Sequence, residues 1–307
     1  MSIAAPIGKP SFGGALAAAA QAAGSQHYPA GALYVAATPI GNLADITLRA
    51  LHVLALADAI ACEDTRHTQQ LLRAYGIDGQ PLIALHEHNE AEAARGVIAR
   101  LQAGERIAYV SDAGTPAVSD PGARLVAACA RAGLRVVPLP GASSVTTAIS
   151  AAGLAGDGGF VFAGFPPAKS GERAAAVQAL AAEPRAVVLL EAPHRIGALA
   201  NALATLGQRP VTVGRELTKQ FEQITTLPCA DLPAWLAADA QRQRGEFALV
   251  LHPAQPSADA EDGERVLRLL LAELPVKSAV RLAAEITGTP RNALYEQALT
   301  LKQANDE

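Results

Sequence analysis

The chain has 307 residues and a formal net charge of −4; half of its residues are hydrophobic and 18% are charged. This length suggests about two domains, and this composition can supply a large core, which excludes a chain that is disordered throughout. The slightly acidic balance excludes a strongly basic nucleic-acid coat protein. It leaves open an enzyme that meets RNA through one local patch.

The few cysteines and histidines argue against a disulfide framework and against a metal site. Cys62, Cys129 and Cys229 are far apart and form no CxxC motif, which is typical of a protein in a reducing cytosol. His86 and His88 would face opposite sides of an extended segment, so we expect no bound metal. No run of about 18 apolar residues is present, so we expect no membrane span and a cytoplasmic protein.

The first half of the chain predicts an α/β domain. Residues 1–30 are rich in Ala, Gly, Ser and Pro and predict a disordered tail. From residue 31, short apolar runs alternate with helical patterns, which favours a largely parallel sheet covered by helices over residues 31–154. The apolar runs are at residues 33–36, 59–62, 81–85, 106–110 and 134–139. The helical patterns are at residues 46–54, 65–75, 89–102, 121–131 and 143–151.

A glycine-rich segment at residues 153–159 indicates a boundary, and a second α/β domain is predicted over residues 155–254. Its expected strands are at residues 160–165, 186–191, 210–217 and 246–251, and its expected helices begin after 170, at 194 and at 232. A polar linker over 253–263 leads to helices at 264–273, 277–286 and 290–301, a helix-turn-helix-like region within 264–307. Residues 265–302 carry six basic and three acidic residues, a net charge of +3, which fits either a mild RNA-binding patch or a solvated helical cap.

Three loops of small residues follow three of the predicted strands. The strongest signal is the loop over residues 111–122, and similar loops lie at 38–43 and 138–144. Ligands of open α/β sheets bind beyond the carboxyl ends of the strands, so three such loops on a parallel sheet would converge and form a cofactor cleft. The alternative is a set of tight turns without a ligand. No phosphate-binding GxxxxGK[ST] or dinucleotide-binding GxGxxG motif is present.

Charged residues follow other strands. Glu63 and Asp64 end the second expected strand, and their alternative role is to cap a helix. Arg215 and Glu216 end a strand of the second domain, where the alternative is a buried structural ion pair.

Six motifs in this order resemble the small-subunit (16S) ribosomal RNA cytidine 2′-O-methyltransferases of the tetrapyrrole-methylase-like superfamily. The motifs are TPIGNL (38–43), EDTRHT (63–68), SDAGTP (111–116), EAPHR (191–195), RELTK (215–219) and GEF (245–247). The resemblance covers residues 31–301. Ala192 departs from it, because a serine is expected before Pro-His-Arg, and this puts a hydroxyl role there in doubt.

The resemblance implies two α/β domains with S-adenosylmethionine in the cleft between them, a small C-terminal helical region and a homodimer. It implies 2′-O-methylation of a cytidine ribose of 16S rRNA at the decoding centre of the small ribosomal subunit. The implied cofactor-binding residues are Pro39, Gly41, Asp112, Ala113, Gly114, Thr115, Pro116, Ser119, Gly141, Ser143 and Gly164.

Methyl transfer to a ribose hydroxyl needs alignment of the reacting atoms, and a base or a stabilising charge beside the oxygen. The candidate catalytic residues are Glu63, Asp64, Glu191, Arg215 and Lys219, with the three carboxylates as alternative bases. The candidate RNA-binding residues are Arg66, His67, His88, Lys169, His194 and Arg195.

Two other functions remain open from the sequence. The first is methylation of a porphyrin or corrin on the same fold, and the second is RNA binding without catalysis.

Overall fold

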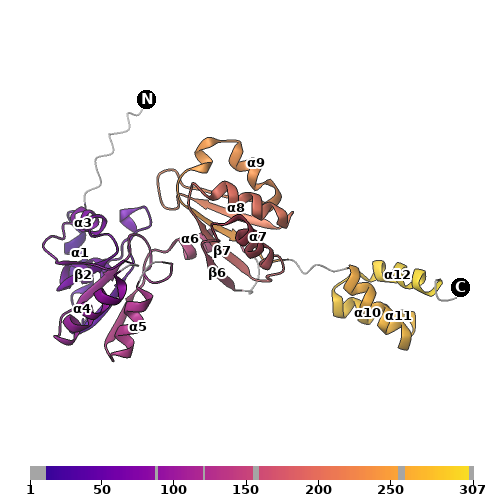
Figure 1. Cartoon of the computed structure of the whole chain (residues 1–307), viewed down its shortest axis with the longest axis horizontal. Helices are drawn as coiled ribbons and strands as arrows, with labels where there is room; N and C mark the ends of the chain where they lie inside the picture. The colour runs from indigo at the N-terminus through magenta and orange to yellow at the C-terminus, as the bar shows by residue number, and fades with distance from the viewer. Residues whose placement is uncertain (1–11, 87–88, 120–121, 155–158, 255–259, 304–307) are drawn as a thin grey trace.

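The computed structural model describes residues 12–86, 89–119, 122–154, 159–254 and 260–303 (Figure 1). The first half of the chain forms a five-stranded sheet in the order β3-β2-β4-β1-β5, in which every pairing is parallel. Its strands are β1 (Ala32–Ala36), β2 (Ala59–Cys62), β3 (Leu82–Ala84), β4 (Ile107–Val110) and β5 (Arg135–Leu139). The predicted parallel sheet is confirmed.

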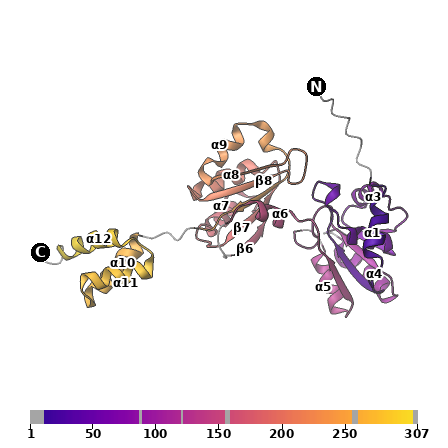
Figure 2. The ribbon, with the colours of Figure 1, turned by 180° about the vertical axis from the view of Figure 1, so that it is seen from behind.

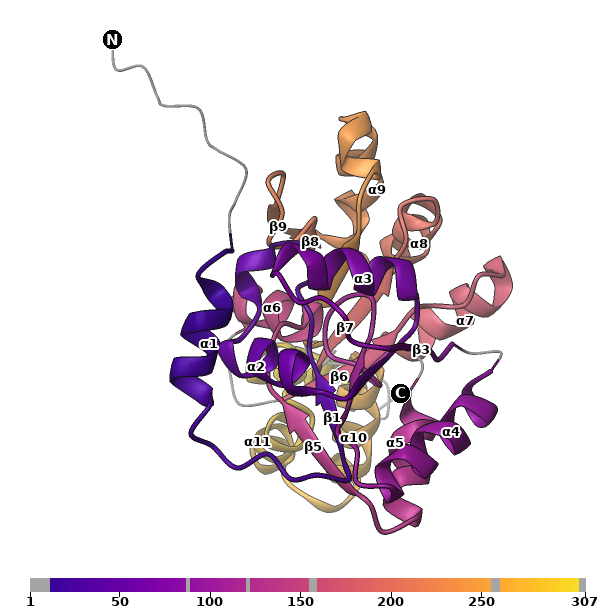
Figure 3. The ribbon, with the colours of Figure 1, turned by 90° about the vertical axis from the view of Figure 1, so that its left-hand side faces the viewer.

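Helices cover both faces of this sheet because successive strand residues point to opposite sides. Tyr34 and Ile60 pack on one side, with α2 (Leu48–Leu56) and α3 (Thr65–Ala74). Leu33, Ala61 and Tyr109 pack on the other side, with α4 (Glu90–Gln102) and α5 (Ala123–Arg131). Figure 3 shows α1 and α2 on one side of this sheet and α4 and α5 on the other.

The predicted disordered tail is wrong for part of residues 1–30. Ala15–Ala23 forms α1, which packs on α2 with Ala19 fully buried. The Tyr28 hydroxyl donates a hydrogen bond to the carbonyl of Ala23 at 3.1 Å. Alanine has the highest helix propensity, so an alanine-rich segment that finds an apolar face to pack on becomes a helix. Residues 1–11 lie outside the described part of the chain.

The second sheet has the order β6-β7-β10-β8-β9 and mixes parallel and antiparallel pairs. Its strands are β6 (Phe160–Gly164), β7 (Ala186–Glu191), β8 (Pro210–Arg215), β9 (Gln223–Pro228) and β10 (Phe247–Leu251). β6 and β7 are parallel, whereas β10 runs antiparallel to both β7 and β8. The amino end of β10 therefore lies at the same edge as the carboxyl ends of β7 and β8. The sequence did not predict the edge strand β9, which pairs with β8.

Helices pack on both faces of the second sheet. One face is covered by α7 (Ser170–Ala179), α8 (Ile196–Leu203) and α9 (Leu232–Ala237). The other face meets α6 (Ser144–Ala151), whose Val145 and Ala148 pack against Val188 and Val250. Short 3₁₀ helices are present at Leu43–Asp45, Ala204–Leu206, Cys229–Asp231 and Ala240–Gln243. The predicted limits of the two domains stay a prediction, and the strands of each sheet lie within them.

The C-terminal helices α10 (Ala260–Glu273), α11 (Val276–Thr287) and α12 (Arg291–Gln303) pack on one another (Figure 2). Their core is built from Leu267, Ala279, Ala283, Leu294 and Ala298. Gly288 has a φ of +71°, a left-handed conformation that ends α11 and turns the chain into α12. In the described ranges, no helix is long and apolar enough to span a membrane.

Candidate functional site

Three loops at the carboxyl ends of β1, β4 and β5 are joined by hydrogen bonds. The amide of Thr38 donates to the carbonyl of Gly114 at 2.9 Å, and the amide of Gly114 donates back to Thr38 at 3.0 Å. The Thr115 hydroxyl donates to the carbonyl of Ala142 at 3.1 Å. The predicted convergence of the three loops is therefore confirmed.

Gly114 sits at the centre of this junction with a φ of +82°, a conformation that favours glycine. A Cβ atom there would lie 3.4 Å from Cγ2 of Ile40 and 3.9 Å from the carbonyl oxygen of Ala142. The loop therefore presents bare backbone beside Ile40, where a ligand can approach closely.

A cavity of about 360 Å³ lies where these loops face the second sheet. The edge of that sheet brings the ends of β7 and β8 beside the start of β10, so all three contribute to the wall. The cavity is lined by Ile40, Ala113, Ser119, Ser144, Phe165, Leu190, Glu191, Ala192, Pro193, Leu217, Glu246, Phe247 and Ala248. Its charged lining residues are two carboxylates, and the rest of the wall is largely apolar.

Glu191 is a buried carboxylate with one unsatisfied oxygen. Its Oε1 accepts a hydrogen bond from the amide of Ala192 at 2.9 Å and lies 3.1 Å from Nε of Arg195. Its Oε2 is buried and has no hydrogen-bond partner among the described residues. Arg195 is itself held by the carbonyl of Pro166. A buried, unpartnered carboxylate oxygen is costly, so this wall of the cavity is suited to a cationic or hydrogen-donating ligand.

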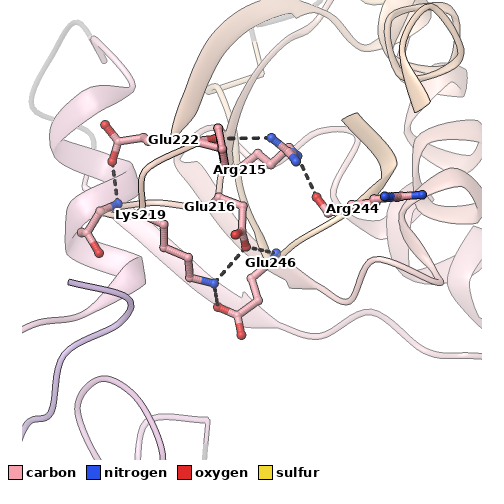
Figure 4. A network of polar contacts seen from close by, with 8 residues as sticks. Arg215, Glu216, Lys219, Glu222, Arg244 and Glu246 are labelled. Carbon is pink, nitrogen blue, oxygen red and sulfur yellow. Dashed lines mark hydrogen bonds and ion pairs between the residues drawn. The ribbon is translucent and has the colours of Figure 1, made fainter. Parts of the chain in front are cut away.

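The second carboxylate of the cavity, Glu246, belongs to a polar network around Lys219 (Figure 4). The ammonium Nζ of Lys219 lies 2.9 Å from Oε1 of Glu216 and 3.0 Å from Oε2 of Glu246. The amide of Glu246 also donates to Oε1 of Glu216 at 2.9 Å. The network fixes the chain on both sides of Glu246 and directs its carboxylate towards Lys219.

The pKa values of Lys219 and Glu216 both differ from their ordinary values. Burial alone would lower the pKa of Lys219, but its hydrogen bonds to Glu216 and Glu246 outweigh burial and raise the pKa. Burial alone would raise the pKa of Glu216, but the hydrogen bonds from Lys219 and from the Glu246 amide lower it. Lys219 therefore stays protonated at neutral pH.

Strained backbone gathers around the cavity. Of the described non-glycine residues, Ala117, Glu216 and Thr218 have positive φ angles, of 65°, 51° and 67°. All three lie in the two loops that flank the cavity, and such strain persists only where the surroundings enforce it. Gly41 is restricted by space and not by its backbone angles, because a Cβ atom there would overlap Cγ of Lys219 and lie 2.9 Å from Cε. Bare backbone at Gly41 makes room for the Lys219 side chain.

Arg215 points away from the cavity. Its Nε donates to the carbonyl of Arg244 at 2.7 Å and its Nη1 donates to the carbonyl of Phe221 at 3.3 Å (Figure 4). These contacts support a structural role, in which Arg215 ties together the two chain segments that carry Lys219 and Glu246.

Asp64 and its neighbours lie at the edge of the first sheet. Oδ1 of Asp64 accepts the amides of Arg66 at 2.8 Å and His67 at 3.3 Å, and these bonds cap α3 and lower the pKa of Asp64. The amide of Asp64 donates to Oδ1 of Asp112 at 3.2 Å, which links the ends of β2 and β4. Glu63 follows β2 directly and is not among the cavity residues. The contacts of Asp64 favour the capping alternative.

The cavity brings together only some of the predicted site residues. Ala113, Ser119 and Glu191 line it, while Gly114 and Thr115 hold the loop junction beside it. Lys169 is exposed and pairs with Glu172, and His194 is exposed next to Pro193. His88 lies outside the described residues. The other predicted cofactor residues, Pro39, Asp112, Pro116, Gly141, Ser143 and Gly164, belong to the same loops or strand ends without lining the cavity.

Glu246 lines the cavity but was not among the predicted site residues, whereas Ile40 and Ser144 lie in predicted loops, Phe165 at a predicted strand end and Leu217 in the RELTK motif. The GEF motif carried the signal for Glu246, but this residue precedes a strand, whereas the predicted ligand loops all follow strands. Within the described ranges, no group of three or more His, Cys, Asp and Glu side chains could hold a metal ion.

Comparison with known families and relatives identifies this chain as a methyltransferase. Residues 32–233 match the family of tetrapyrrole (corrin/porphyrin) methylases, and the chain belongs to that family. Solved structures with the same fold include the cobalt precorrin-4 methyltransferase CbiF, with a TM-score of 0.54 and 19% identity over 73% of this chain and 98% of that one. The methyltransferase CobJ has a TM-score of 0.55 and 19% identity over 72% and 94% of the two chains.

Within this fold, the chain belongs with the proteins named ribosomal RNA small subunit methyltransferase I. It is 51% identical to the one from Escherichia coli O157:H7 over 273 residues, which cover 88% of this chain and 95% of the relative. It is 50% identical over 279 residues to the one from Pseudomonas aeruginosa, which cover 88% and 97% of the two chains. Residues 257–302 match the RsmI C-terminal HTH domain.

Proposed function

We propose that this enzyme transfers a methyl group from S-adenosylmethionine to the 2′-oxygen of a cytidine ribose in 16S rRNA, at the decoding centre of the small ribosomal subunit. The relatives that share about half of its residues are named as methyltransferases of small-subunit ribosomal RNA. The match of residues 257–302 to the C-terminal domain of that family supports the same assignment.

The chemistry of the cavity fits S-adenosylmethionine. This cofactor carries a cationic sulfonium and an ammonium group, and it supplies an activated methyl group when bound. The buried, unpartnered Oε2 of Glu191 lies in this lining and attracts a cation, whereas the carboxylate of Glu246 is already paired with Lys219. The backbone of Ala113 and Gly114 offers close approach, and Phe165, Leu217 and Phe247 offer apolar surface for a flat ring.

The remaining cofactor residues act by shaping the loops. Asp112, Pro116 and Ser119 belong to the loop that Gly114 and Thr115 anchor. We assign to the loops around Pro39 and Gly41, around Gly141 and Ser143, and at Gly164 the role of closing the cleft. Excluding water there strengthens every electrostatic contact with the reacting groups.

The proposed contacts to RNA are Arg66, His67, His88, Lys169, His194 and Arg195, of which Arg66, His67, Lys169 and His194 are exposed, Arg195 is partly buried and His88 lies outside the described residues. Arg66 has 88% and Lys169 82% of its side chain exposed, so both can reach phosphate groups. The target cytidine has to leave its folded surroundings to reach the cleft, as in other enzymes that modify nucleotides.

Methylation of a porphyrin or corrin is the weaker alternative. Such substrates carry many carboxylates, whereas the described cavity lining holds two glutamates and no basic residue. The solved corrin and porphyrin methyltransferases are less than 25% identical to this chain, so their similarity indicates a shared fold and not a shared substrate.

We further infer a homodimer in the cytoplasm. The edge hairpin of β8 and β9 exposes Phe221 at 69% and Ile224 at 41%, and exposed apolar side chains at an unpaired edge strand favour contact with another chain.

A methyl-transfer assay with labelled S-adenosylmethionine tests the proposed function. Small subunits from a strain that lacks this enzyme should accept about one methyl group each, whereas subunits from the parent strain should accept almost none. A porphyrinogen serves as the competing acceptor. Equal labelling of both kinds of subunit, or preferred labelling of the porphyrinogen, would overturn the proposal.

A further inference from the structure

Glu246 differs from Glu191, the other carboxylate that lines the cavity, in its exposure and its support. Its side chain is 73% exposed, yet its Oε2 is held 3.0 Å from Nζ of Lys219. Its amide and its carbonyl both bond to Glu216, at 2.9 Å each, so the backbone beneath it is fixed. A carboxylate that lines a cavity, is open to water and is held by a rigid network can contact both a substrate in the cavity and the surrounding water.

Transfer of a methyl group to a ribose hydroxyl requires the hydroxyl proton to leave, and a base must deliver that proton to solvent before the next turnover. Glu191 has a side chain with no exposed area and is paired with Arg195, so a proton taken up there has no direct route to water. Asp64 is used by the amides that it caps. Lys219 is protonated and cannot accept a proton at neutral pH.

We propose that Glu246 is the general base for the 2′-hydroxyl and that Lys219 is the positioning residue that aims its carboxylate; this inference rests on the proposed function. The 2′-O–H bond breaks and its proton passes to the Glu246 carboxylate. The oxygen forms a bond to the methyl carbon, and the bond from that carbon to sulfur breaks with its electron pair left on sulfur. The protonated Glu246 then releases its proton to the water at its exposed side.

The two carboxylates of the cavity have different surroundings, and these suit them to different roles. Glu191 is buried and lacks a partner for Oε2, which suits a permanent contact to a bound cation. Glu246 is exposed, and among the described residues only Lys219 contacts its carboxylate, through Oε2, which leaves Oε1 for the substrate hydroxyl. Differing environments of two carboxyl groups are what separates their roles in other enzymes.

The test compares Glu246→Gln with Glu222→Gln in the full-length enzyme, with small subunits that lack the methyl group as substrate. Glu222 is an exposed carboxylate of the same loop whose Oε2 accepts the amide of Thr218 at 2.6 Å, and it does not line the cavity. An amide oxygen can replace the carboxylate as a hydrogen-bond acceptor in both variants, so each keeps its loop contact. Only Glu246→Gln removes a base from the cavity.

We expect kcat of Glu246→Gln to fall about 100-fold or more, with the affinity for S-adenosylmethionine within about threefold of the wild type. The deficit should shrink from about pH 7 to about pH 9, because hydroxide then removes the proton, while Lys219 and Glu216 keep their charges. Glu222→Gln should keep kcat within about twofold, and Glu246→Asp should recover part of the lost activity because it restores a carboxylate. Thermal unfolding of every variant is recorded beside the kinetics.

The outcomes separate the inference from the proposed function. An inactive wild type on unmethylated subunits contradicts the proposed function. If the wild type is active and Glu246→Gln matches its kcat, Glu246 is not the base. An equal loss of kcat in Glu222→Gln assigns the effect to the shape of the loop and overturns the inference as well.

Discussion

Replacing Gly114 by alanine should weaken binding of S-adenosylmethionine, and its cost in stability should be limited to the backbone strain of a residue at positive φ. Gly114 has a φ of +82°, and an added Cβ atom would meet only Ile40 and Ala142 within 4 Å, so the methyl group would stand at the margin of the cavity. A ligand that packs on the bare backbone would have to retreat by roughly the length of one carbon–carbon bond, about 1.5 Å. Losing those contacts should weaken binding at least tenfold, or about 1.4 kcal/mol.

Gly104 offers a matched control on the other end of the same strand. It precedes β4 with a φ of +92°, and a Cβ atom there meets nothing within 4 Å. Both alanine variants should lose about 1–2 kcal/mol of unfolding free energy through backbone strain. Calorimetric titration should then find the weaker cofactor binding in Gly114→Ala alone. Equal cofactor affinity in the two folded variants would refute this position of the cofactor.

Three further changes have defined outcomes. Lys219→Met should cost about 1 kcal/mol of unfolding free energy near neutral pH. Folding lowers the pKa of Glu216 and raises that of Lys219. The difference from the wild type should therefore shrink as the pH falls through the lowered glutamate pKa and as it rises through the raised lysine pKa. Denaturant titrations at several pH values would record both losses. Gly122 has a φ of +116°, and an added Cβ atom there would overlap the buried ring of Tyr109. Gly122→Ala should therefore lower the free energy of unfolding in urea by about 3 kcal/mol or more. Truncation after residue 256 removes helices that have their own core, so cofactor affinity in calorimetry should stay within about twofold, whereas binding to small subunits should weaken and depend less steeply on salt.

The first sheet and its loops were predictable because local patterns determine them. Short apolar runs such as 33–36 and 107–110 are typical of buried parallel strands, and each is followed by small residues that can only serve a turn or a ligand. The convergence of Gly114 with Thr38 then follows from the parallel direction of β4 and β1.

The second sheet was harder to predict because its direction changes are not local. β10 runs antiparallel to β7, which brings the start of the strand and Glu246 to the cavity, and no pattern in the sequence encodes that pairing. β9 was missed because its polar alternation, QITTLP, resembles a loop until β8 provides its partner. Arg215 carries the right charge for a catalytic role, but only the folded chain reveals that its guanidinium is used by the carbonyls of Arg244 and Phe221.

The helix α1 shows the same limit at the amino end of the chain. Its alanines favour a helix, but an isolated nine-residue helix is unstable in water without a surface to pack on. That surface is supplied by α2, whose apolar face is only apparent once the sheet has formed.

The most direct test of the proposed activity is the position of the transferred methyl group. Small subunits from a strain lacking this enzyme would be methylated by the purified protein, and their 16S rRNA would be digested and analysed by mass spectrometry. The proposed function predicts one added methyl group, on the ribose of a cytidine in the decoding centre. A methyl group on a base, or on a nucleotide elsewhere in the subunit, would contradict it.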